Sequence, residues 1–160
     1  MKTNNEYTSI VNDILDNEKF DKIRYIEHHG ITRYEHSIHV SYISYKIAKK
    51  LGLDYRQVAR AGLLHDFFMS EERRTIKEKL ISTFTHPKKA LENAEKNFEL
   101  SKREKNIIES HMFPISNIAP KSKEAWMVSL SDKIVAAFEG VARAKAQIGV
   151  WMLFLVNFIR

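Results

Sequence analysis

The chain contains very little of the material from which tight turns are made. Only five glycines and three prolines occur in its 160 residues. A sheet-rich fold needs many turns, and glycine and proline are the residues that most often form them. The composition therefore favours long helices joined by few loops. We expect an all-α fold in a single domain over residues 1–160, because a chain of this length can bury a real core.

Apolar spacing and capping residues predict the helices of the first half of the chain. Two short helices are expected, near residues 10–15 and over about residues 20–30. A longer helix is expected from about Thr32 to Leu51, and Gly52 follows it as the residue that ends the helix. Asp54 is then expected to cap a helix that carries His65 and Asp66 at its far end.

The same signals predict the helices of the second half. Residues 69–85 are polar and less regular, so we expect a short helix within a loop there. His86-Pro87 is expected to start another helix, since proline suits the first turn. Ser101-Lys102-Arg103-Glu104 is a capping-box pattern that opens a helix ending at His111. A long last helix is expected from about Ser122.

The C-terminal stretch is unusually apolar. Residues 148–159 contain Asn157 as their one polar side chain, but this run is shorter than the roughly 20 residues of a spanning helix. We expect a closing helix over about residues 141–159, packed on the core or on a second subunit of a homodimer. Contact with a membrane surface is the alternative, and no membrane span is expected.

Charge and cysteine content indicate which ligands and which cell compartment suit the chain. The formal net charge is +6, with lysine and arginine scattered among acidic residues. Such a surface can favour anionic ligands such as phosphates, and no stable nucleic-acid partner is expected. The chain has no cysteine, which is compatible with a reducing compartment, and Met1 to Glu6 is polar, so no signal peptide is expected. We expect a cytoplasmic protein.

Two titratable side chains, His65 and Asp66, stand at the end of the apolar segment 58–64. Buried polar groups need hydrogen bonds, and buried charges need a partner or a metal ion. Histidines and an aspartate on other predicted helices can supply that partner, namely His36, His86, His111 and Asp132. A bundle that points one ligand inward from each of several helices builds a metal site in its core. Imidazole and carboxylate suit iron, manganese, zinc, cobalt or nickel better than calcium.

Three segments of the chain resemble a known family. Arg33-Tyr34-Glu35-His36-Ser37, Ala61-Gly62-Leu63-Leu64-His65-Asp66 and Ser131-Asp132-Lys133 are similar to the motifs of the HD-domain superfamily of metal-dependent phosphohydrolases. The resemblance covers about residues 32–139 and implies a helical bundle of the HD type. It also implies that His36, His65, Asp66 and Asp132 are ligands of a first metal ion.

Two further histidines extend the resemblance. His86 and His111 fall between the His65-Asp66 pair and the last aspartate, as in the binuclear branch of the family. That branch implies that Asp66 bridges two ions and that His86 and His111 bind the second. After Asp66 the chain continues with Phe67 rather than the glycine of the HDIG form, and it has no GYP motif. An HD-GYP cyclic-dinucleotide phosphodiesterase is therefore not expected.

The resemblance implies a phosphohydrolase. A water activated by one or two divalent ions would cleave a phosphoester or phosphoanhydride bond in a small, nucleotide-like substrate. Arg33 and Lys133 flank ligand positions and are candidates for contacts with phosphate oxygens, beside Asp66 as the catalytic carboxylate. The alternatives are a mononuclear nucleotidase that uses the first four ligands, a non-catalytic metal or nucleotide sensor, and an iron oxygenase. His28, His29 and His39 are assigned no chemistry.

Overall fold

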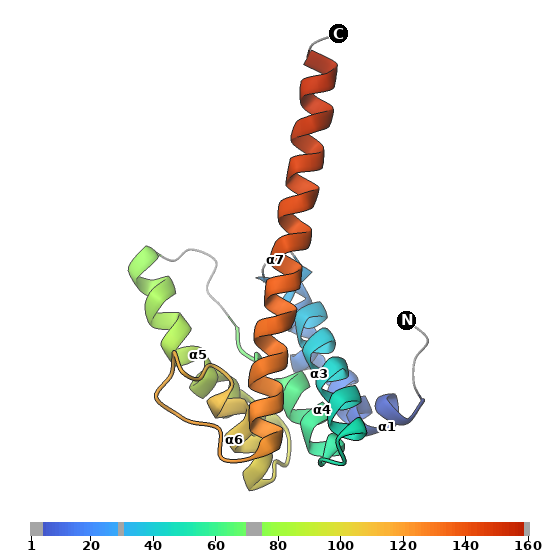
Figure 1. Cartoon of the computed structure of the whole chain (residues 1–160). Helices are drawn as coiled ribbons and strands as arrows, with labels where there is room; N and C mark the ends of the chain where they lie inside the picture. The colour runs from blue at the N-terminus through green and yellow to red at the C-terminus, as the bar shows by residue number, and fades with distance from the viewer. Residues whose placement is uncertain (1–4, 29–30, 70–74, 159–160) are drawn as a thin grey trace.

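The chain folds into a bundle of α-helices in the computed structural model, which describes residues 5–28, 31–69 and 75–158 (Figure 1). In these ranges the helices are α1 (Asn5–Leu15), α2 (Glu18–Asp21), α3 (Arg33–Lys50), α4 (Tyr55–Leu64), α5 (Ile76–Asn97), α6 (Lys102–Ser110) and α7 (Lys123–Phe158). A 3₁₀ turn, η1 (Lys22–Tyr25), and two strands of two residues each, β1 (Glu27–His28) and β2 (Ile31–Thr32), join α2 to α3. The strands pair antiparallel. The prediction of an all-α fold is confirmed.

Local chemistry fixes several helix ends where the sequence predicts them. The Asp54 side chain accepts a hydrogen bond from the backbone N–H of Gln57 and so caps α4. Ser101 and Glu104 form the predicted capping box at the start of α6. Gly52 follows α3 with a φ of 68°, a left-handed conformation that glycine adopts without steric cost.

The structure corrects three helix predictions. His86-Pro87 does not start a helix, because α5 begins at Ile76 and passes through Pro87. Proline cannot donate to the carbonyl of residue 83, yet the tertiary packing keeps the helix continuous across it. Residues 76–85, expected to lie in a loop with a short helix, belong to α5, whereas residues 70–74 lie outside the described residues. The helix expected over residues 20–30 ends at Tyr25 and gives way to β1.

The core forms where α3 and α4 cross closely. A Cβ atom on Gly62 of α4 would lie only 3.1 Å from the Cα of Ser41 on α3, so the two backbones are nearly in contact. The Ser41 hydroxyl donates to the carbonyl of Ala59 (2.6 Å) and accepts from the Tyr7 hydroxyl (2.8 Å), which ties α1 to the same point. Side chains that are fully buried around this crossing include Val11, Ile14, Phe20, Ile23, Val40, Leu63, Leu64, Ile107, Ile108 and Val128. The C-terminal end of α4 is therefore held inside the bundle.

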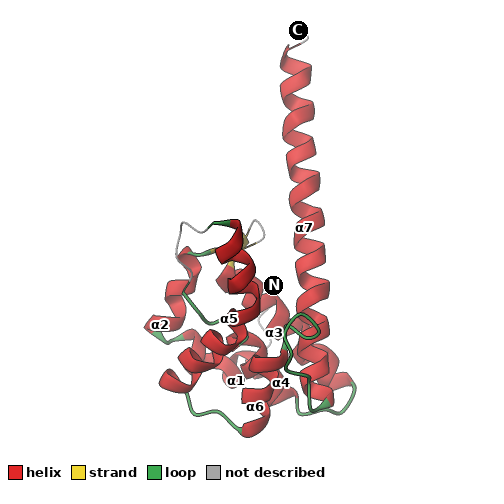
Figure 2. Cartoon of the chain, turned by 90° about the vertical axis from the view of Figure 1, so that its left-hand side faces the viewer, coloured by secondary structure: helices red, strands yellow, loops and turns green. Residues whose placement is uncertain are grey.

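Helix α7 has two halves with different surroundings. Its first half packs against α3, α4 and α6. Its second half extends beyond the rest of the bundle in both views (Figures 1 and 2), and every residue from 140 to 148 is exposed. The segment expected to close on the core is thus a continuation of α7, and over residues 140–148 it does not pack on the core. Packing on a second subunit stays a prediction, as does a single domain over residues 1–160.

The described part of the chain contains no helix that combines the length and the apolar character needed to cross a bilayer.

Candidate metal centre

Five segments bring the six predicted ligand residues to one place in the bundle. His36 lies in the first turn of α3, where the Thr32 capping box fixes the start of the helix. The others are His65 at the C-cap of α4, Asp66 directly after it, His86 within α5, His111 at the C-cap of α6 and Asp132 within α7. All are buried except His86, whose side chain is 12% exposed. The sequence prediction that these residues come together agrees with this geometry.

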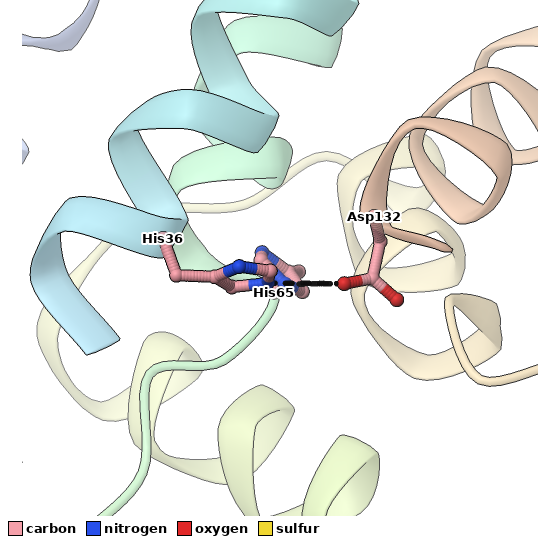
Figure 3. A group of neighbouring side chains, drawn as sticks. All are labelled: His36, His65 and Asp132. Carbon is pink, nitrogen blue, oxygen red and sulfur yellow. Dashed lines mark hydrogen bonds and ion pairs between the residues drawn. The ribbon is translucent and has the colours of Figure 1, made fainter. Parts of the chain in front are cut away.

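A first group consists of His36, His65 and Asp132 (Figure 3). Its ligand atoms all lie within 4.8 Å of one another. The Oδ1 atom of Asp132 is 3.1 Å from Nε2 of His36 and 3.6 Å from Nε2 of His65. One carboxylate from α7 therefore faces two imidazoles from α3 and α4, an arrangement suited to one divalent ion.

A second group adjoins the first and consists of His65, Asp66 and His111. His86 completes it, because its Nε2 atom is 3.0 Å from Nε2 of His111 and 3.3 Å from Oδ1 of Asp66. His65 belongs to both groups, but its Nε2 atom has a single lone pair and can serve one ion. A carboxylate has two oxygens, so Asp66 or Asp132 could bridge two ions, and the choice of Asp66 stays a prediction from the family resemblance.

The four histidines share one orientation. In each imidazole the Nδ1 atom lies within hydrogen-bond distance of an oxygen acceptor, which leaves Nε2 toward the centre. The pairs are His36 with Oε2 of Glu139 (2.8 Å), His65 with the Gly62 carbonyl (2.8 Å), His86 with the Ser82 carbonyl (3.2 Å) and His111 with the Ile108 carbonyl (2.7 Å). A carbonyl oxygen only accepts, so the contacts of His65, His86 and His111 assign the proton to Nδ1 and a lone pair to Nε2 in these three residues. Metal-ligating histidines are held in this way.

Two consequences of this orientation test whether the site fits a metal ion. The buried Nε2 atom of His65 has no hydrogen-bond partner among the described residues. The Nε2 atoms of His86 and His111 face each other at 3.0 Å, so their lone pairs repel unless a cation lies between them. The donor set is thus incomplete without a positive charge, and it fits a divalent transition metal.

The electrostatics of the site divide the histidines into two kinds. Burial lowers the pKa of His111 to about 3, assisted by the neighbouring imidazoles His65 and His86, and burial also lowers the pKa of His86. Both are neutral near pH 7 and can offer lone pairs. Burial opposes the charged form of His36 as well, but hydrogen bonds with Asp132 and Glu139 outweigh it and raise its pKa to about 9.

Asp132 shows the reverse effect. Burial would raise the pKa of its carboxyl group, but the hydrogen bond with His36 and the nearby imidazole of His65 hold that pKa well below its usual range. Asp132 therefore stays ionised inside the bundle. A buried carboxylate that is kept charged in this way is suited to binding a cation.

The structure adds Glu139, which the sequence analysis missed. Its Oε2 atom is 2.8 Å from Nδ1 of His36, and its Oε1 atom is 2.9 Å from Nδ1 of His39. His39, to which we assigned no chemistry, contacts the same carboxylate through its other oxygen and from a partly exposed position. The available signal was spacing, because Glu139 follows Asp132 by seven residues, which is two turns on the same helix face.

The two predicted phosphate-binding cations are engaged within the chain. Nη1 of Arg33 donates to the Phe68 carbonyl (2.5 Å), and the guanidinium lies over the Phe68 ring, which stacks on His86. The ammonium of Lys133 donates to the carbonyl of His111 (2.8 Å) and to both oxygens of Ser129 (3.1 Å each). These contacts support the positioning of His86 and His111. Direct contact of Arg33 or Lys133 with phosphate stays a prediction.

A helical bundle with this buried set of histidines and aspartates has the donors that a divalent metal ion needs. Comparison with protein families identifies the family: the family model described as HD domain matches residues 33–137. The chain therefore belongs to the HD-domain family, part of a superfamily of metal-dependent phosphohydrolases. The matched range contains all six predicted ligands and ends before Glu139. No solved structure matches the chain significantly.

Proposed function

We propose that this protein is a binuclear metal-dependent phosphohydrolase that cleaves a phosphoester or phosphoanhydride bond in a small, nucleotide-like substrate. The observation that carries the proposal is the convergence of four Nε2 atoms and two carboxylates on one buried centre. His36, His65 and Asp132 would hold one ion. His86 and His111 would hold the second, and Asp66 would bridge the two.

Divalent ions bound there, of iron, manganese, zinc, cobalt or nickel, would supply a water of lowered pKa and neutralise charge on the phosphate group. The chain's own residues prepare the site. Glu139 and the three backbone carbonyls orient the imidazoles, so that little reorganisation is needed on binding. Lys133 ties the main chain of His111 to α7. Burial of the ligands excludes bulk water and strengthens every electrostatic interaction within the centre.

Metal content and hydrolysis test this proposal together. Chain stripped of metal and incubated with Mn²⁺ or Fe²⁺ is expected to bind two ions, counted by elemental analysis. It is expected to hydrolyse at least one of a phosphomonoester, a phosphodiester and a dinucleoside polyphosphate. His65→Ala and Asp66→Ala should abolish binding and turnover, whereas His39→Ala, the matched control outside the ligand set, should keep the metal. A wild-type chain that stays metal-free contradicts the proposal.

The stoichiometry of His86→Ala separates the proposal from its nearest alternative. The loss of one of two ions supports a binuclear site. An unchanged ion count supports a mononuclear nucleotidase that uses His36, His65, Asp66 and Asp132. Metal and nucleotide binding without any product supports a sensor, and oxygen consumption by the iron form supports an oxygenase.

A further inference from the structure

The second half of α7 is a long helix with little of its own chain beside it. All 36 residues of α7 would span about 54 Å, and the 19 residues from 140 to 158 account for about 28 Å of it. An exposed ion pair joins Arg143 to Glu27 (3.8 Å), but residues 140–148 are all exposed (Figures 1 and 2). An unpacked helix of this length is only marginally stable in water. Something other than its own bundle is needed to cover it.

The sequence of α7 carries a continuous heptad pattern on its outer face. Apolar residues recur at alternating intervals of three and four over 32 residues, and we call this set the α7 seam. The seam consists of Met127, Leu130, Ile134, Ala137, Val141, Ala144, Ile148, Trp151, Leu155 and Phe158. Leu130 is 57% exposed, Val141 53% and Ile148 62%, so the seam faces away from the bundle at these three positions. A sustained pattern of this kind is typical of a helix that pairs with another helix.

The last part of α7 is apolar on all sides, not only along the seam. Residues 149–156 contain no polar side chain. A helix that is apolar all round must be covered on more than one side. A single helix packed along the seam would leave its other faces in water.

An apolar groove of about 820 Å³ lies at the opposite end of α7. The first turns of α7 form one wall through Trp126 and Leu130. Leu51 and Leu53, between α3 and α4, and Phe113 and Pro114, after α6, also line the groove. Its apolar lining could cover the apolar C-terminal end of an α7 helix. The C-terminal end of α7 in the same copy cannot reach it, because the two ends of one helix lie far apart.

We propose that two copies of this chain pair through antiparallel α7 helices, so that residues 152–158 of each copy lie along the groove of the other. The heptad fixes the register, because in an antiparallel pair each a position faces a d position. Five kinds of layer result, each present twice about the two-fold axis: Met127 with Phe158 of the partner subunit, Leu130 with Leu155 of the partner subunit, Ile134 with Trp151 of the partner subunit, Ala137 with Ile148 of the partner subunit, and Val141 with Ala144 of the partner subunit. The two-fold axis passes between residues 142 and 143, and every seam residue has a partner.

Two features favour this arrangement over a parallel pair. A parallel pair would leave the groove without an occupant and the outer faces of residues 149–156 in water. In the antiparallel pair the groove walls lie beside residues 152–156, and each seam alanine meets a larger residue of the partner subunit. A seam about 48 Å long and about 10 Å wide covers about 500 Å² on each copy, or about 1,000 Å² in total, which meets the lower limit for a specific interface before the groove is counted.

Mass measurement of the full chain tests the pairing. Sedimentation or light scattering should give twice the 18.7 kDa chain mass for the wild type. Val141→Glu places two charges beside the two-fold axis and should give a single chain mass with unchanged helicity, since Val141 is exposed within one copy. Ala146→Glu is the matched control, because residue 146 lies on the face opposite the seam, and it should remain a dimer.

Cysteine cross-linking tests the register, since the natural chain has no cysteine. The Ala137→Cys/Ile148→Cys double variant should form a covalent dimer on oxidation, whereas each single variant should not. Cross-linking of either single variant would show a parallel pair and overturn the proposal. A monomeric wild type would also overturn it. If that monomer sediments with phosphatidylcholine–phosphatidylglycerol vesicles, residues 149–158 bind a lipid surface instead.

Discussion

Glu139 provides the sharpest test of how the centre is organised, because it contacts the predicted ligand His36 without belonging to the ligand set. Its two oxygens accept from Nδ1 of His36 (2.8 Å) and Nδ1 of His39 (2.9 Å). Glu139→Gln keeps the shape of the side chain but removes its charge and one of the two acceptors. Loss of such an outer partner typically costs 10–100-fold in metal affinity, which is about 1.4–2.8 kcal/mol. We expect a weakening of this size for the ion held by His36.

The assay is competition between the protein and a chelator for Mn²⁺, with circular dichroism to confirm an unchanged fold. Glu139 raises the pKa of His36, so NMR titration of the metal-free variant should give a His36 pKa below the wild-type value of about 9. His39→Ala is the control, because it leaves the contact between Glu139 and His36 in place. If Glu139→Gln binds Mn²⁺ as tightly as the wild type, or if His39→Ala loses as much affinity, Glu139 does not act through His36.

Three further substitutions test the packing and charges of the bundle. Gly62→Ala would bring a Cβ atom to 3.1 Å from the Ser41 backbone, so urea denaturation should show a loss of about 1–3 kcal/mol in the free energy of unfolding. Gly140→Ala meets no atom within 4 Å on an exposed helix face and should gain about 0.5–1 kcal/mol; effects of the same sign would contradict this account. The hydrogen bond from Lys49 lowers the pKa of Glu6 from 4.5 to about 2, so ionised Glu6 stabilises the fold above pH 4.5 and loses this effect as the pH falls through 2. Glu6→Gln should therefore be less stable than the wild type at pH 7 and equally stable well below pH 2, and a difference that persists there would refute the role of this charge.

The features that could be predicted best from the sequence are those that depend on residues close together along the chain. The caps of α4 and α6 form because Asp54 and Ser101 satisfy backbone N–H groups within three residues of themselves. The helix start at Pro87 was wrong because proline's preference for a first turn is weak compared with the packing of a long helix. The true start of this helix, at Ile76, depends on contacts with distant parts of the chain, and no local sequence pattern reveals them.

The convergence of the six predicted ligand residues was predictable for a different reason. Each of the six residues is polar at a position where its helix must face the core, and such residues need a common explanation. Glu139 was not predictable in this way, since its contact with His36 spans 103 residues and depends on how α7 packs against α3. The carbonyls that hold His65, His86 and His111 belong to the backbone, and no side-chain pattern reveals them.

Helix α7 explains why the site and the proposed pairing surface can coexist in so small a chain. Its inner face carries Asp132 and Glu139, which are fixed by imidazoles from α3 and α4. Its outer face carries Ile134 and Val141, which are exposed within one copy. Because 3.6 residues make one turn, the spacing of seven that aligns Asp132 with Glu139 also aligns Ile134 with Val141 on a different face. One helical period therefore serves both surfaces, and charge can be placed on the seam without touching a residue that faces the metal centre.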